Sequence, residues 1–383
     1  MVEVNKKSVM IVAAEASSSH YALKLLKSWQ STHPEISCFG VGSLDMEKLG
    51  FERLGRAEEM AVVGASEIIS QYSLLKSVFD RLVAEATIRR PQVVVVMEYP
   101  EFNLMLAKKL HGLGLKVVYY ISPQVWAWRK GRVKTIKKYC DKALLLFPFE
   151  VPFYEKHQVS HEFVGHPLLD ELDSKYFDPE FLKVHRNRFG IQSHETVLGI
   201  MPGSRKLELK NHLPQQLRVA GELLKKHPHL KLVVLCAPTI EKDQILEYFE
   251  DFRHPFQLLK NSPFDMISLT DVMLATSGTA TLQVGLLEKP MVIMYRVSFL
   301  TAVLGRMIVK GYFGLVNLIL GEEAVPERLN WQATDQELFK HLDQWISKPE
   351  TKQPVVEKLK KLRFMLGDIG ASKRVVEVLS RYL

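Results

Sequence analysis

Short, β-branched apolar runs alternate with longer amphipathic stretches along the chain, and this alternation constrains the fold most. Apolar runs without polar alternation are typical of strands covered on both faces. Strands alternating with helices predict parallel sheets joined by right-handed crossovers. The predicted strands are 9–13, 91–97, 115–121, 143–147, 197–201, 230–236, 272–275 and 291–294, and the predicted helices are 22–29, 65–86, 102–110, 213–226 and 281–288.

The alternation breaks between His166 and Ser193, where Asp170–Asp178 is polar and acidic and Pro179 opens a new helix. We therefore predict two Rossmann-like, doubly wound α/β domains, 1–168 and 169–360, facing a cleft. Helices in 361–383 are expected to cross back to the first domain. Ligands of open α/β sheets bind beyond the carboxyl ends of the strands, so functional residues should follow strands directly.

Charge and cysteine content narrow the partners and the compartment. The 383 residues include 51 Lys and Arg against 43 Asp and Glu, a net charge of +8. This excess suits an anionic partner such as a nucleotide, a phosphorylated lipid or an acidic membrane surface, and it does not single out nucleic acid. Cys38, Cys140 and Cys236 are far apart, which indicates a reducing compartment. No apolar window approaches the roughly 20 residues of a membrane span, and the N-terminus does not match a signal peptide.

The segment Gly199–Arg205 ends a predicted strand, turns at Pro202–Ser204 and enters a basic helix. Gly203 lets backbone amides approach a ligand closely. A helix N-terminus beside Arg205 offers positive charge to a diphosphate. A simple strand-to-helix turn with a solvated arginine explains the same residues equally well.

A second loop, Ala275–Ala280, also follows a strand and opens a helix. Ser277, Gly278 and Thr279 present hydroxyls and amides that suit phosphate or ribose oxygens. Ser and Thr are also ordinary helix caps, so this loop alone is a weak signal. Two such loops in the second half of the chain favour a nucleotide site there.

Polar side chains follow the most apolar strand of the first half: Glu98, Glu101 and Asn103. We expect them to face the cleft, where a carboxylate such as Glu98 can act as a general base. Glu101 lies in the first turn of a helix that begins at Pro100, and an acidic residue there also stabilises the helix dipole. A purely structural role therefore fits Glu101 better than Glu98.

The loop that follows the strand at 115–121 combines aromatic and basic side chains. Trp126, Trp128, Arg129 and Arg132 suit a sugar ring and a phosphate, or a membrane interface. Tryptophans packed between helices are the alternative. The histidines form no HExxH pattern, and GxSxG and GxxxxGK[ST] are absent. We therefore expect no metal site, and a nucleotide held by loop amides and arginine.

In this order, the segments resemble the lipid-A-disaccharide synthase family over nearly the whole chain. Ile121–Arg129 is similar to the family's most specific motif, SPxVWAWR, which other families of the GT-B glycosyltransferase architecture lack. Glu98–Asn103 is similar to its DxPDFN. The other matching segments are Ile11–Ser17, Glu58–Glu67, Leu146–Glu150, Phe163–Pro167, Pro202–Arg205, Thr276–Ala280 and Asn317.

The resemblance implies a GT-B fold and an inverting hexosyltransferase without a cofactor. The family transfers 2,3-diacylglucosamine from UDP onto 2,3-diacylglucosamine 1-phosphate, which gives a β(1→6) disaccharide 1-phosphate and UDP. Inversion requires a base for the attacking 6-hydroxyl and charge stabilisation for the leaving diphosphate.

The resemblance also assigns roles to residues of this chain. The catalytic candidates are Glu98, Glu15 and Glu101. The expected UDP-binding residues are Gly203, Ser204, Arg205, Ser277, Gly278, Thr279, Ala280, Gln283 and Asn317. The expected acceptor and lipid residues are Asn103, Ser122, Trp126, Trp128, Arg129, Arg296 and Arg306. Acyl chains require an apolar surface, for which 299–313 is the stronger candidate, because core packing accounts for Met60–Val63.

The chain departs from the family pattern at site positions. The family's GEASGD is here Ala14–His20, without its two glycines and its aspartate. Glu98 and Glu101 replace the aspartates of DxPDF, and a base displaced by about 1 Å loses roughly 100-fold in rate. Gln283 replaces a glutamate expected at the ribose, and it keeps one acceptor without the charge.

These departures leave three interpretations open: the family's own reaction, a UDP-sugar transferase with another acceptor, and a catalytically impaired nucleotide- or lipid-binding homologue. The expected partners are a UDP-activated acylated amino sugar, an acylated glucosamine 1-phosphate and an anionic membrane surface, with no nucleic acid. A homodimer stays open. We expect a cytoplasmic protein attached peripherally to the inner face of the inner membrane.

Overall fold

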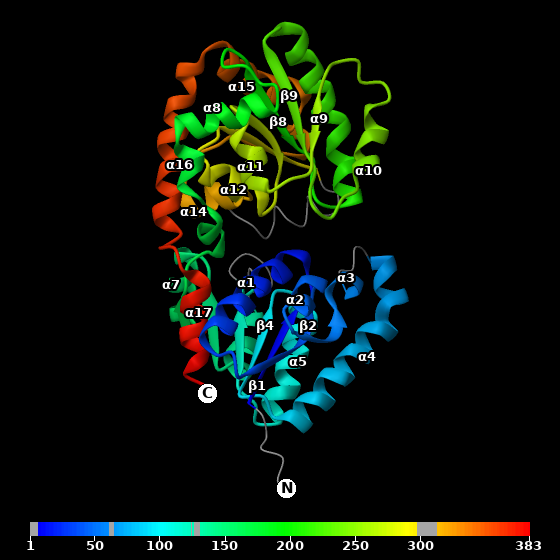
Figure 1. Cartoon of the computed structure of the whole chain (residues 1–383), viewed down its shortest axis with the longest axis vertical. Helices are drawn as coiled ribbons and strands as arrows, with labels where there is room; N and C mark the ends of the chain where they lie inside the picture. The colour runs from blue at the N-terminus through cyan, green and yellow to red at the C-terminus, as the bar shows by residue number, and fades with distance from the viewer. Residues whose placement is uncertain (1–6, 61–64, 124, 126–130, 297–311) are drawn as a thin grey trace. The chain divides into compact units, whose positions relative to one another are not determined.

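The structure is a computed structural model that describes residues 7–60, 65–123, 125, 131–296 and 312–383, with the backbone alone at 16–17 and 65–71. It divides into two compact units (Figure 1). Unit 1 is the chain up to Asp170 together with Leu366–Leu383, and unit 2 is Glu171–Met365. Each unit has its own parallel sheet with flanking helices, so the predicted two-domain α/β fold class is confirmed.

The sheet of unit 1 has the order β3-β2-β1-β4-β5-β6-β7, and each described strand pair is parallel. Its strands are β1 (Ser8–Ala13), β2 (Ser37–Gly42), β3 (Glu52–Arg56), β4 (Val93–Met97), β5 (Val117–Tyr120), β6 (Lys142–Leu145) and β7 (His161–Phe163). Its helices are α1 (Ala16–Thr32), α2 (Leu44–Lys48), α3 (Ala57–Met60), α4 (Ala65–Arg89), α5 (Pro100–Gly112), α6 (Arg132–Tyr139), α7 (Val151–Lys156) and α17 (Ala371–Ser380).

The centre of this sheet follows directly from the sequence. Every residue of β4 is fully buried, and so are those of β1 from Val9 onward, apart from a 1% exposure at Ile11. Helices cover both faces, which is why a run of four valines with no polar alternation is stable here. The predicted strand at 91–97 is therefore confirmed as β4.

Strands β2 and β3 were not predicted, because their sequences lack a continuous apolar run. The segment Ser37–Gly42 contains two glycines, and Glu52–Arg56 is mostly polar. Gly40 has φ +136°, and a Cβ atom there would lie 2.2 Å from the Ile11 carbonyl oxygen of the neighbouring strand. Glycine at this position thus lets β2 pack beside β1. It also interrupts the apolar pattern from which a strand is predicted.

The sheet of unit 2 has the order β10-β9-β8-β11-β12-β13 and is also parallel. Its strands are β8 (Thr196–Met201), β9 (Leu230–Leu235), β10 (Gln257–Leu259), β11 (Val272–Thr276), β12 (Met291–Tyr295) and β13 (Glu327–Leu329). Its helices are α8 (Pro179–Arg188), α9 (Lys206–Lys226), α10 (Lys242–Leu246), α11 (Pro263–Ser268), α12 (Ala280–Leu286), α14 (Leu315–Leu320), α15 (Asp335–Ser347) and α16 (Gln353–Met365). The two edge strands have three residues each, too few to show a periodicity.

The C-terminal helix α17 belongs to unit 1, where it packs against α1 (Figure 1). His33 Nε2 lies 2.7 Å from Ser380 Oγ at this contact. Arg374 Nε donates to the Val164 carbonyl oxygen over 2.8 Å. Unit 1 is therefore assembled from two separate segments of the chain.

Within the described ranges, no helix is long and apolar enough to cross a membrane.

The close approach of β1 and β2 yields a stability prediction. Gly40→Ala should destabilise the fold by about 3 kcal/mol or more, because the new methyl group overlaps a backbone atom and φ is positive. Gly112→Ala is the matched control. This glycine ends α5 with no atom near its Cβ position, so alanine should be neutral or stabilising by up to about 1 kcal/mol. Urea unfolding of the three proteins measures both changes, and equal midpoints would contradict the prediction.

Candidate functional site

Unit 2 has its topological switch point between β8 and β11. Strands β9 and β10 lie on one side of β8, and β11, β12 and β13 lie on its other side, so the strand order reverses direction at β8. Met201 and Ala275 are partners in this pairing, so the loops that follow the two strands begin at the same edge of the sheet. Open α/β sheets bind their ligands at such a point.

The loop after β8 has a backbone that requires glycine. Gly203 has φ +118°, and a Cβ atom there would lie 2.5 Å from Glu208 Cβ. Thr239 Oγ1 donates to the Ser204 carbonyl oxygen over 2.7 Å and fixes the loop to the residues that follow β9. The loop is therefore held in one conformation, with Arg205 at the start of α9.

This loop already binds an anionic group of the chain itself. The Ser204 N–H donates to Glu208 Oε2 over 2.7 Å, and Arg205 Nη1 lies 3.4 Å from Glu208 Oε1. The Arg205 side chain is 56% exposed, so it is accessible to a ligand. An amide and a guanidinium that hold a carboxylate together are also suited to a phosphate oxygen.

The loop after β11 is open at its surface. The Ser277 N–H donates to the Met294 carbonyl oxygen over 3.0 Å, which ties the loop to β12. Gly278 and Thr279 are exposed, while Ser277, Ala280 and Gln283 are half-buried. The structure thus brings the residues of both predicted loops to one edge of one sheet.

Gln216 connects the two strand ends and was missed by the sequence analysis. It is fully buried in α9, and its Nε2 lies 3.3 Å from the Met201 carbonyl oxygen and 3.4 Å from that of Leu274. Thr276 Oγ1 is a third neighbour at 3.4 Å. A polar residue on the apolar face of a predicted helix was the signal available in the sequence.

Asn317, expected at the nucleotide, is fully buried in α14. Its Nδ2 donates to the Val325 carbonyl oxygen and to Glu327 Oε2, and its Oδ1 accepts from the amides of Ala324 and Val325. Because all four hydrogen-bonding positions are used, its side chain in this structure holds the segment before β13 in place.

Arg296 is exposed and directly follows β12. Its Nη2 donates to the Ala333 carbonyl oxygen over 3.2 Å. The predicted residues Trp126, Trp128, Arg129 and Arg306 lie outside the described residues.

Unit 1 has its switch point between β1 and β4, where Ala13 and Met97 are partners. The turn after β4 is strained, since Glu98 has φ +50° and Tyr99 has φ +41°. Ile121, after the adjacent strand β5, has φ +57°. Left-handed backbone at non-glycine residues costs about 1–3 kcal/mol each and gathers at functional sites.

Hydrogen bonds hold this strained turn. The Glu98 N–H donates to the Ile121 carbonyl oxygen over 3.2 Å, and the Glu98 carbonyl accepts from Tyr119 Oη over 2.6 Å. Asn103 Nδ2 donates to the carbonyl oxygens of Glu98 and Met97 over 2.8 and 2.9 Å. The backbone of Glu98 therefore has a fixed position.

Asn103 itself is fully buried, and its Oδ1 has no hydrogen-bond partner among the described residues. A buried unsatisfied oxygen costs about 1–3 kcal/mol. Asn103 was expected at the acceptor. In this structure its side chain hydrogen-bonds to the backbone of the Glu98 turn.

Three carboxylates lie around this turn. Burial raises the pKa of Tyr99, and the charges of Glu15 and Glu101 raise it further. Glu101 is exposed and forms an ion pair with Arg132. Glu98 is half-buried and directly follows β4.

The changes from the family pattern after β1 are accommodated by hydrogen bonds. The Glu15 N–H donates to Ser18 Oγ over 3.0 Å, and Ser18 Oγ donates to the Glu15 carbonyl oxygen over 3.0 Å. Ser19 Oγ donates to the Ala13 carbonyl oxygen over 3.1 Å. Ala14, Ser18 and Ser19 have no positive φ, so none of these positions requires glycine.

Ser122 lies half-buried after β5, and its Oγ accepts from the buried Tyr154 Oη over 2.5 Å.

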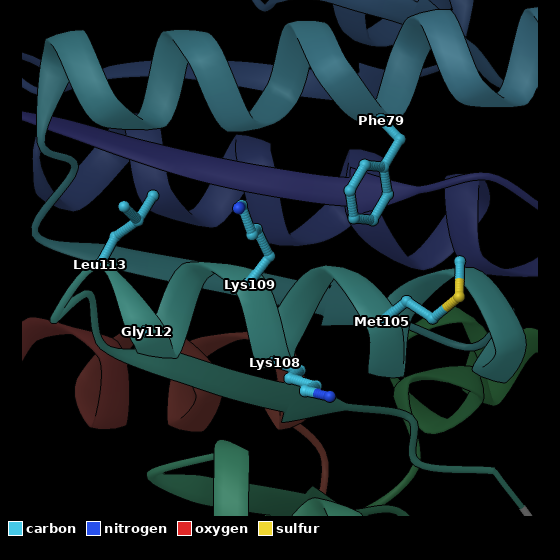
Figure 2. A pocket seen from close by; sticks show the side chains of 6 residues that line it. All are labelled: Phe79, Met105, Lys108, Lys109, Gly112 and Leu113. Carbon is cyan, nitrogen blue, oxygen red and sulfur yellow. The ribbon is translucent and has the colours of Figure 1, made fainter.

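A shallow pocket of unit 1 lies away from this edge. Its volume is about 340 Å³, and its walls come from α4, from α5 between Met105 and Gly112, and from the residue after α5 (Figure 2). Because α5 starts at the Glu98 turn and runs away from it, the pocket lies along the helix from its middle to its C-terminal end. The lining residues are Phe79, Met105, Lys108, Lys109, Gly112 and Leu113.

Across the part of the chain that the structure describes, no three His, Cys, Asp or Glu side chains gather closely enough to hold a metal ion.

Solved structures define the class to which this fold belongs. A UDP-GlcNAc 2-epimerase from Neisseria meningitidis, solved with UDP-GlcNAc, matches with a TM-score of 0.63 at 13% identity, over 98% of this chain and 100% of that one. A glycosyltransferase of kitacinnamycin matches with a TM-score of 0.64 at 14% identity, over 98% and 99%. Such likenesses show the fold alone, which is that of the GT-B glycosyltransferases and the UDP-GlcNAc 2-epimerases.

Sequence comparison narrows this class to one family. Residues 9–373 match the family model described as lipid-A-disaccharide synthetase. The lipid-A-disaccharide synthase of Myxococcus xanthus is 34% identical over 97% of both chains, and that of Geobacter sulfurreducens is 33% identical over 100% of this chain and 99% of its own. The chain therefore belongs to the lipid-A-disaccharide synthase family of glycosyltransferases, as the motifs predicted.

Proposed function

We propose that the chain joins UDP-2,3-diacylglucosamine to 2,3-diacylglucosamine 1-phosphate, with inversion at the anomeric carbon and release of UDP. The observation that carries the proposal is family membership over residues 9–373. The residues at the two switch points support the proposal. In unit 2 a loop amide and an arginine hold a carboxylate, and in unit 1 a glutamate directly follows a central strand.

Unit 2 would hold the UDP-sugar. The Ser204 amide and Arg205, which now bind the Glu208 carboxylate, would bind the diphosphate and stabilise its charge as the glycosidic bond breaks. Ser277, Gly278, Thr279 and Ala280 would supply further amides and hydroxyls, and Gln283 one acceptor at the ribose. The proposal needs no metal ion.

Unit 1 would supply the base. Glu98 would accept the proton of the acceptor 6-hydroxyl while that oxygen attacks the anomeric carbon. The strained, hydrogen-bonded turn would keep the longer glutamate side chain in a productive position. Glu15 and Glu101 are the other carboxylates within this region.

The experiment is to incubate the purified chain with both acyl sugars, without added divalent metal, and to measure UDP and the disaccharide. Equal UDP release with donor alone would show hydrolysis instead of transfer. UDP release that depends on a different acceptor would favour a UDP-sugar transferase with another acceptor. No release with retained UDP binding would favour a catalytically impaired homologue.

Glu98→Gln tests the base. It should keep UDP binding and lower kcat by about 100- to 10,000-fold, because the amide cannot accept the proton. Glu101→Gln is the matched control, since this exposed residue pairs with Arg132, and it should have a much smaller effect. Glu98→Asp restores the residue of the family motif, and its rate shows whether the site has adjusted to glutamate. Wild-type kcat in all three variants would move the base to Glu15.

UDP should raise the melting temperature of the wild-type chain without a metal ion, by roughly 5–10 °C at a hundredfold excess over Kd. Arg205→Ala should reduce this shift, because it removes the guanidinium from the loop. Arg218→Ala is the control. Arg218 lies on the same helix, is similarly exposed at 58% and pairs with Asp335. Equal shifts in both variants, or a shift that requires magnesium, would count against the donor site.

We also propose peripheral attachment to anionic membranes, based on the +8 charge and on the basic, apolar character of the sequence from Arg296 to Phe313. The attraction is partly electrostatic, so it should weaken as salt rises. Co-sedimentation with vesicles that contain anionic phospholipid, at low and high salt, measures it. Equal recovery in the supernatant with and without vesicles at low salt would remove the proposal.

A further inference from the structure

His212 is a buried polar residue of α9 that has no part in the proposed reaction described above. It is 1% exposed, and its ring stacks on Tyr295 at a centroid distance of 5.2 Å. Tyr295 is the last residue of β12. The side chain thus bridges the helix that follows the anion-binding loop and the end of a strand.

Both ring nitrogens are committed to backbone groups. Nδ1 lies 2.7 Å from the Glu208 carbonyl oxygen, which can only accept, so Nδ1 carries the hydrogen. Nε2 accepts from the Arg296 N–H over 2.9 Å, and it can do so only in the neutral ring. Burial lowers the pKa of His212, and the Arg296 cation adds to this effect, whereas the Glu208 carbonyl and charge oppose it.

The two partners of His212 adjoin different parts of the candidate donor site. Glu208 holds the Ser204 amide and Arg205 with its carboxylate. Arg296 follows β12, whose Met294 carbonyl accepts from the Ser277 amide of the second loop. One imidazole therefore connects the loop after β8 to the strand that supports the loop after β11.

We propose that His212 is a positioning residue that holds the Ser204–Arg205 loop and the end of β12 at the spacing an anionic sugar nucleotide requires. The inference rests on the proposed function, because it concerns the same donor site. His212 contacts no reacting atom, and it acts through Glu208 and Arg296. Loss of the Nε2 bond removes the hydrogen bond between α9 and the residue that follows β12, so the donor groups of the two loops lose their fixed spacing at the diphosphate.

The test compares three substitutions that remove different bonds. His212→Phe keeps a ring against Tyr295 and removes both hydrogen bonds. His212→Asn keeps a donor near the Nδ1 position, within α9. His212→Gln keeps an acceptor near the Nε2 position, which is the bond between α9 and β12. The readouts are the Kd of UDP by titration calorimetry, and KM for the sugar nucleotide together with kcat.

His212→Phe and His212→Asn should raise both the Kd of UDP and the donor KM by about 10-fold, with a smaller change in kcat. His212→Gln should keep most of the wild-type affinity for UDP. The matched control is His185→Phe. His185 is also buried in unit 2, stacks on Phe181 and lies 3.1 Å from the Asp265 carbonyl oxygen, so its loss should lower stability and leave UDP affinity unchanged.

Several results would overturn the inference: UDP affinity within twofold of wild type in His212→Phe, equal affinities in His212→Asn and His212→Gln, or an affinity loss in His185→Phe as large as that in His212→Phe. UDP binding is measured without an acceptor. A wild-type chain that binds UDP and transfers no sugar therefore contradicts the proposed reaction alone. A wild-type chain that binds no UDP overturns the inference together with the donor site.

Discussion

The parallel pairing of β8 with β11 is the contact on which the candidate donor site depends. Parallel strands end at a common edge, so the partners Met201 and Ala275 deliver two separate loops to one place. The buried Gln216 amide then joins the carbonyl groups of both strand ends to α9. The sheet and this amide thus determine where both loops start.

Helix α9 organises this edge through residues spaced by four. Glu208, His212 and Gln216 lie on one face of the helix. From its start inward they contact the Ser204 amide, the Arg296 amide and the ends of β8 and β11. His212 and Gln216 are buried, and each meets backbone partners in or directly after a strand, which offsets the cost of burying a polar group.

The sequence predicted the fold class and the two post-strand loops, because β8 and β11 are apolar runs. Pro202–Arg205 follows the first run and Ser277–Thr279 follows the second. Strand β2 escaped prediction because Gly40 serves a close backbone approach instead of an apolar pattern. The local roles of Asn103 and Asn317 could not be predicted, because the sequence does not show whether an asparagine side chain is buried. The carbonyl groups that these two side chains bind come near them only in the folded chain. His212 was missed for a related reason: the Arg296 amide that it contacts lies 84 positions away in the chain.

The return of α17 to unit 1 has a consequence for biosynthesis. Unit 2 is one continuous stretch of chain, whereas unit 1 lacks a helix that packs on α1 until the residues after Leu366 have left the ribosome. During translation, the surface of α1 that α17 later covers has no partner in the chain while all of unit 2 is being made. The incomplete first unit is thus exposed to aggregation until the end of the chain is made.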